Sequence, residues 1–104
     1  MNEIKQEQWS DFPQKNGVQL IYFFTPMCGT CQLAGKMLEV VEKTVQNIQI
    51  IKCNLNYAPV VAVQYEIESV PCLAIWDNGK LVEKIYAFKS VPHLYEIVKL
   101  YSEK

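Results

Sequence analysis

The pattern of apolar and polar positions is clearest between Gln19 and Val45. The unbroken apolar run Leu20–Phe24 is rich in β-favouring residues and has the length of one strand buried on both faces. Thr25 and Pro26 end this run, and apolar residues then recur at helical spacing, which predicts a helix with one buried face. The members of that apolar stripe are Cys31, Ala34, Leu38, Val41 and Val45.

The segment before this strand is polar, with Ile4, Trp9 and Phe12 as its apolar members. It predicts a short edge strand or extended start, followed by one or two helical turns that pack Trp9 and Phe12 inward. Residues 13–17 contain Pro, Asn and Gly and predict a turn.

Two strands and a short helix are predicted after the long helix. Ile48–Leu55 has the composition of a second buried strand, and a turn then leads into a helix that begins near Pro59. Cys72–Trp76 predicts a third strand. We expect the inner side of the short helix and its exit to consist of Val60, Val63, Tyr65 and Ile67.

The C-terminal part of the chain predicts a hairpin strand and a final helix. Asp77-Asn78-Gly79 is a strong hairpin signal before the segment 80–87, and Ser90 is a plausible cap for a helix whose apolar stripe contains Leu94 and Val98. Two strand–helix–strand crossovers imply neighbouring parallel strands, while the hairpin adds an antiparallel edge. The sequence therefore predicts a mixed sheet with helices on both faces.

Length and composition limit the possible classes of protein. A chain of 104 residues predicts a single domain over residues 1–104. The net charge of −1 gives no electrostatic footprint for nucleic acid and no basic surface for an anionic membrane. The first six residues lack the apolar core of a signal peptide, and the longest apolar run is too short to span a bilayer. We therefore expect a reducing cytoplasm, where four cysteines do not imply a disulfide framework.

Cys28 and Cys31 stand at the predicted start of the long helix, directly after the strand. A helix N-terminus presents unpaired N–H groups and a partial positive charge, both of which stabilise a thiolate. We expect Cys28 to be the attacking nucleophile and Cys31 the resolving thiol, which releases a mixed disulfide from within. Half of a zinc site and an inert pair are the alternatives, but Cys53, Cys72 and the single histidine, His93, supply no second half with metal-ligand spacing.

In these residues the chain resembles the thioredoxin family, and the resemblance covers nearly the whole chain. It rests on the strand leading into Cys28-Gly29-Thr30-Cys31, on Lys52–Asn56, on Val70-Pro71, on the 77–80 hairpin and on the final helix. The resemblance implies a thioredoxin fold, three-layer α/β/α with a central mixed sheet of four to five strands. It also implies that Pro71 is cis and lies beside the cysteine pair, where free backbone groups of Val70 bind a client peptide as an added strand. A simple helix-to-strand break is the alternative for Pro71.

The motif departs from the family's usual Trp-Cys-Gly-Pro-Cys at two positions. Thr30 replaces the proline and keeps an N–H and a hydroxyl that can stabilise a thiolate, so we expect a less reducing potential than that of a thioredoxin. Met27 replaces the tryptophan and keeps the rim apolar, as part of a contact surface.

Three further positions differ from the family or stay ambiguous. Tyr22 stands where thioredoxins carry a buried aspartate, and a phenol with a pKa near 10 cannot act as a base at neutral pH. Lys52 matches the family's partner lysine and either lowers the pKa of a thiol or is a strand-end charge extended to solvent. Tyr86 stands at a glycine that lets partners approach, so we expect a reshaped groove and a narrower client set.

The sequence therefore predicts a cytoplasmic, monomeric thiol–disulfide oxidoreductase without a bound cofactor. Its partners would be client protein or small-molecule disulfides and an external reductase. The alternatives are a metal- or cluster-binding module that uses Cys28, Cys31 and Cys72, and a redox-gated interaction domain. Cys72 follows Pro71 directly, so it is an accessory thiol, a site of mixed disulfides, a metal ligand or a small buried hydrophobe. The last of these interpretations also applies to Cys53.

Overall fold

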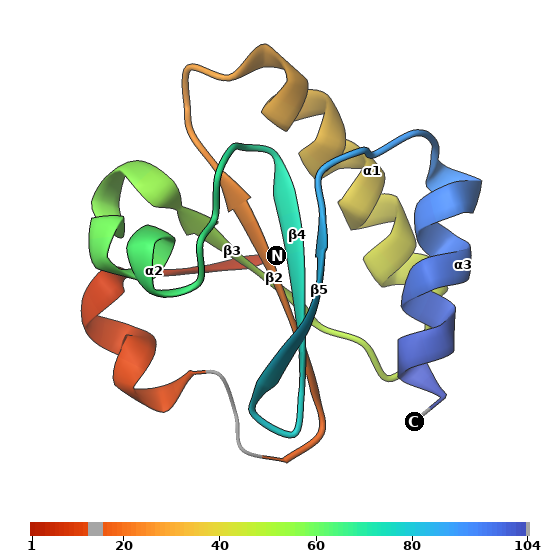
Figure 1. Ribbon diagram of the computed structural model, residues 1–104. Coiled ribbons are helices and arrows are strands. Elements are labelled where there is room, and N and C mark those ends of the chain that lie inside the picture. Colours follow the sequence, from red (N-terminus) through yellow and green to blue (C-terminus); the bar gives the residue numbers. More distant parts are fainter. Residues whose placement is uncertain (13–15, 104) are drawn as a thin grey trace.

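A five-stranded mixed sheet lies between two layers of helices in the computed structural model, which describes residues 1–12 and 16–103 (Figure 1). The strand order is β1-β3-β2-β4-β5. The strands are β1 (Asn2–Ile4), β2 (Val18–Phe24), β3 (Ile50–Asn54), β4 (Cys72–Asp77) and β5 (Lys80–Ile85). The helices are α1 (Gly29–Thr44), α2 (Pro59–Gln64), α3 (Val91–Ser102) and the 3-10 helices η1 (Gln6–Asp11) and η2 (Leu55–Tyr57). The predicted three-layer α/β/α class is confirmed.

The central strand β2 explains why the apolar run Leu20–Phe24 has no polar residue. It pairs parallel with β3 and antiparallel with β4, so both of its edges are hydrogen-bonded inside the sheet. Successive side chains of a strand point to opposite faces. Leu20 and Tyr22 accordingly belong to the core beneath α1 and α3, whereas Ile21 and Phe23 belong to the core on the side of α2 and η1.

Helices α1 and α3 pack side by side on one face of the sheet (Figure 1). The predicted stripe of α1 is confirmed, because Cys31, Ala34, Leu38 and Val41 are buried. Val45, which caps the helix, is also buried. The long helix is thereby held rigidly against the sheet, and its first turn is fixed at the carboxyl end of β2.

The opposite face is covered by η1 and α2 (Figure 1). Trp9 and Phe12 pack on this core as predicted, and the Trp9 ring stacks on Phe23 and contacts the rings of Tyr65 and Trp76. Strand β1 pairs parallel with β3 at the edge, which confirms the edge strand. The predicted turn over residues 13–17 falls partly on residues 13–15, which lie outside the described residues.

The second predicted parallel crossover is wrong. Strand β4 is not a neighbour of β3; it pairs with β2 in the antiparallel direction. Because β3 runs parallel and β4 antiparallel to β2, β4 begins at the end of the sheet where β3 finishes. The continuous apolar run of β4 fits a buried strand of either direction, so its residues do not indicate which direction it takes.

The predicted inner side of α2 is also partly wrong. Val60 and Val63 are 61% and 79% exposed, and Val61 is buried instead, whereas Ile67 is buried as predicted. Pro59 occupies the first turn, as expected, but a helix of six residues is too short for its periodicity to identify a face.

The hairpin between β4 and β5 is confirmed. Asn78 and Gly79 occupy its turn with φ values of 53° and 82°, the left-handed region that Asn-Gly adopts in tight hairpins. Strand β3 spans fewer residues than predicted, and β5 ends at Ile85 rather than continuing to residue 87. Within residues 1–12 and 16–103, no helix combines the length and apolar character needed to cross a bilayer.

Candidate active site

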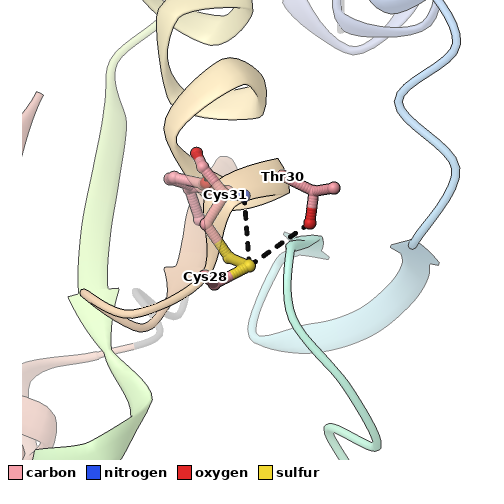
Figure 2. The surroundings of a disulfide bond; sticks show 4 residues. Cys28, Thr30 and Cys31 are labelled. Carbon is pink, nitrogen blue, oxygen red and sulfur yellow. Dashed lines mark hydrogen bonds between the residues drawn. A yellow bond between two sulfur atoms is a disulfide. The ribbon is translucent and has the colours of Figure 1, made fainter.

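The cysteine pair lies where β2 gives way to α1. Cys28 is the N-cap residue of α1, and its backbone N–H donates to the carbonyl of Thr25 in the turn that follows the strand. Cys31 lies in the first turn of the helix and forms a disulfide with Cys28, with the two Cα atoms 5.2 Å apart (Figure 2). This separation lies within the ordinary range for bonded cysteines.

Two polar groups converge on the sulfur of Cys28. The backbone N–H of Cys31 donates to Cys28 Sγ over 3.1 Å, and Thr30 Oγ1 lies 3.3 Å from the same sulfur (Figure 2). Cys28 is partly accessible, whereas Cys31 is only 3% exposed. The outer cysteine can therefore meet a client, whereas the inner cysteine is almost entirely buried.

Pro71 and Thr30 line one groove beside the pair, with a volume of about 420 Å³. The Val70–Pro71 peptide bond is cis. Val70 is half-buried against the α2-side core, and Met27, which directly precedes Cys28 in the chain, is 95% exposed. Gly29 leaves open space, because a Cβ atom added there would meet nothing within 4 Å. The rim of the pair is thus mainly apolar and open to a large ligand.

Tyr22 lies behind Cys31, on the inner side of α1. Its hydroxyl donates to the backbone carbonyl of Cys31, and burial raises the pKa of Tyr22 to about 12. A phenol with this pKa stays protonated at neutral pH, so it fixes the first turn of the helix and does not accept a proton. Its ring also lies against Gly35, where a Cβ atom would be 3.6 Å from Tyr22 Cε2.

A second cavity, of about 450 Å³, is lined by Cys31, Tyr22 and Lys52. Lys52 is paired with Tyr22 across β2 and β3, and its ammonium lies 5.6 Å from the centre of the Phe24 ring. The structure thus brings Lys52 to the cavity behind Cys31, where its ammonium lies over the face of the Phe24 ring.

The remaining cysteines are buried in the α2-side core. Cys53 and Cys72 are both 0% exposed, and burial raises the pKa of each thiol to about 11. A shared metal site that joins Cys28 to Cys72 would require an exposed Cys72 thiol, which this packing does not offer. Among residues 1–12 and 16–103, no cluster of three or more His, Cys, Asp or Glu side chains is placed to hold a metal ion.

Tyr86 directly follows β5 and lines the groove beside Pro71. Its ring packs on the α2-side core, and its hydroxyl accepts a hydrogen bond from the backbone N–H of Glu68. Lys84, which we did not single out from the sequence, reaches the same segment and donates to the carbonyls of Tyr65 and Glu66. In the sequence, the two-residue spacing of Lys84 and Tyr86 in the predicted hairpin strand could have indicated that both side chains lie on one face.

Comparison with known proteins agrees with this geometry. The sequence model of the thioredoxin family matches residues 1–99. The thioredoxin-like protein YusE of Bacillus subtilis (strain 168) is 44% identical over 99 residues, which cover 95% of this chain and 92% of YusE. A thioredoxin of Chlamydia caviae is 33% identical over 86 residues, covering 83% of this chain and 84% of that protein.

The fold has a close counterpart among solved structures. A single-residue mutant of a thioredoxin from Halobacterium salinarum NRC-1 superposes with a TM-score of 0.85, and the match covers 99% of this chain and 91% of that one. At 22% sequence identity this similarity concerns the fold alone.

Proposed function

This chain belongs to the thioredoxin family, and we propose that it is a thiol–disulfide oxidoreductase in which Cys28 attacks and Cys31 resolves. The observation that carries the proposal is the environment of the Cys28 sulfur. It caps α1, accepts the Cys31 N–H, and is accessible while its partner sulfur is buried. These are the conditions under which a thiolate is stabilised and still able to react.

The exchange consists of two displacements. The Cys28 thiolate attacks one sulfur of a client disulfide, the client S–S bond breaks, and the leaving thiolate takes a proton from solvent. The thiol of Cys31 then loses its proton and attacks Cys28 Sγ, which releases the second client thiol and forms the Cys28–Cys31 disulfide. Two electrons have passed to the client, and an external dithiol reductase returns two electrons to the pair.

Thr30 supports a potential less reducing than that of a thioredoxin. Its hydroxyl lies within hydrogen-bonding distance of Cys28 Sγ, and a thiolate with an additional donor is more stable. Because stabilising the reduced form makes the disulfide a stronger oxidant, the potential becomes less negative. Lys52 has the supporting role of keeping positive charge near the cavity behind Cys31.

The client would lie across the apolar rim of the site, between Met27 and Val70. An extended peptide can pair with the backbone of Val70 as an added strand. Met27 offers a flexible apolar contact, and Tyr86 fills space where a smaller residue would leave the groove open. These features support a narrower client set than that of a broad protein-disulfide reductase.

Reduction of a chromogenic aromatic disulfide under recycling conditions tests the proposal. Cys28→Ser abolishes turnover, because serine cannot form the mixed disulfide. Cys53→Ala is the matched control, since it removes a thiol from the buried core and leaves the pair intact. Turnover at the wild-type rate in folded Cys28→Ser protein would refute the assignment.

A further inference from the structure

The segment 65–71 carries the chain from the end of α2 to the start of β4 and includes Val70 (Figure 1). Its first part is fixed by the helix end. The N–H of Ile67 donates to the carbonyl of Ala62, the N–H of Glu66 donates to the carbonyl of Val63, and the Ile67 side chain is buried. Glu68 and Ser69, which come next, are exposed. The surface beside Cys28 therefore depends on what holds this exposed part.

Strand β5 supplies contacts to this segment. The register pairs Ala74 with Lys84 and Leu73 with Ile85, so Tyr86 follows opposite Cys72. Lys84 faces the α2 side together with its partner Ala74, and the Tyr86 ring packs on the same core. From there the Lys84 ammonium lies 3.3 Å and 2.9 Å from the carbonyl oxygens of Tyr65 and Glu66. A cation at the end of a helix satisfies carbonyls that have no partner within the helix.

Tyr86 connects the chain on the two sides of the Val70–Pro71 bond. Its hydroxyl accepts the Glu68 N–H over 3.3 Å, and its ring packs on the same core as the buried Cys72. The phenol thus links residue 68, before this bond, to the core that contains residue 72, after it. An aromatic side chain suits this task because it has few rotatable bonds and its ring is packed in the core.

We propose that Tyr86, assisted by Lys84, is a positioning residue that fixes the backbone of residues 68–70 for an extended peptide client. This inference rests on the proposed function, and it gives Tyr86 a role through Glu68 in addition to its place on the groove wall. A client that pairs with a strand-like edge needs the edge held in register, whereas a small aromatic disulfide needs only the sulfur of Cys28. The contacts of Tyr86 and Lys84 therefore favour peptide disulfides over small aromatic disulfides as substrates.

Tyr86→Phe removes the hydroxyl and keeps the ring. We expect the KM for a peptide disulfide to rise about three- to tenfold, as for the loss of one hydrogen bond, with kcat within about twofold. The KM for a small aromatic disulfide rises less than the KM for the peptide disulfide, and the reduction potential of the cysteine pair is unchanged. Tyr101→Phe is the matched control, because its hydroxyl also bonds to β5, at Glu83, but far from the cysteine pair. Its KM for the peptide stays at the wild-type value.

Amide hydrogen exchange on the oxidised protein provides a readout that does not depend on activity. Exchange at Glu68 and Val70 accelerates in Tyr86→Phe and not in Tyr101→Phe. If Tyr86→Phe fails to fold, Lys84→Met tests the same segment against Lys80→Met, and Lys84→Arg restores the donor. The proposal would be overturned if Tyr86→Phe changed neither the amide exchange at Glu68 and Val70 nor the KM for the peptide. It would also be overturned if the KM rose equally for the peptide and the small disulfide. Failure of the proposed function gives a different result, because reductase activity would then persist in Cys28→Ser protein.

Discussion

Thr30 Oγ1 lies 3.3 Å from Cys28 Sγ at the first turn of α1. Cys28 Sγ also accepts the N–H of Cys31, so its sulfur faces a backbone donor and a hydroxyl together. A proline at position 30 would supply neither a hydroxyl nor an N–H. The environment of the outer sulfur is therefore set by the residue in which this chain departs from the usual family motif.

Thr30→Val tests this relationship, because it removes the hydroxyl and keeps the shape. The pKa of Cys28 rises and the reduction potential becomes more negative by roughly 10–30 mV, which corresponds to a hydrogen bond worth about 0.5–1.5 kcal/mol. Thr30→Ser retains the hydroxyl and stays close to wild type. Equilibration with glutathione measures the potential, and equal values for Thr30→Val and wild type would show that the hydroxyl does not act on the thiolate.

Gly35→Ala stabilises the protein. An added Cβ atom would make an ordinary contact of 3.6 Å with the Tyr22 ring, and alanine is favoured over glycine within a helix by about 1 kcal/mol. Gly17→Ala is the control with the opposite sign, because Gly17 has open space around it but a φ of 80°. Urea unfolding of the oxidised proteins measures both, and destabilisation by Gly35→Ala would contradict the described packing.

Glu66→Gly also stabilises the protein, for a different reason. Glu66 has a φ of 52° at the end of α2, where glycine avoids a left-handed penalty of about 1 kcal/mol. The same substitution at Glu96, an exposed position inside α3, destabilises by a similar amount. Thermal unfolding compares the two variants, and shifts of the same sign would contradict the assigned helix end.

The two buried thiols make stability fall in alkali. Burial raises the pKa of Cys53 and Cys72 from 9.0 to about 11, so between pH 9 and 10 the unfolded chain loses protons that the folded chain keeps. The free energy of unfolding therefore decreases as pH rises through this window. Cys53→Ala makes that slope shallower when the oxidised proteins are unfolded in urea at each pH. A slope identical to wild type would mean that Cys53 ionises equally in both states.

Long periodic segments of the sequence predicted the fold, and short ones did not. The stripe from Cys31 to Val41 spans three turns of α1, so its buried face is evident from spacing alone. Helix α2 has six residues, and its exposed Val60 and Val63 carry no such pattern. The direction of β4 was also missed, because its apolar residues look the same in a parallel or an antiparallel strand.

The outer part of the site was predictable for a local reason. Cys28, Thr30 and Cys31 lie within one helical turn, so their proximity follows from chain geometry. The contact between Tyr86 and Glu68 joins residues 18 positions apart and depends on the register of β5 against β4. Such a contact could not be predicted without the sheet.

The central claim is that Cys28 attacks and Cys31 resolves, and trapping with a mixed disulfide tests it most directly. Reduced Cys31→Ser and Cys28→Ser proteins are each mixed with a peptide disulfide, and the intact masses and modified residues are determined by mass spectrometry. We expect Cys31→Ser to accumulate one peptide adduct on Cys28, because the resolving thiol is missing, and Cys28→Ser to form none, because Cys31 is buried. An adduct on Cys31 that forms at a comparable rate, or no adduct on Cys28, would contradict the account.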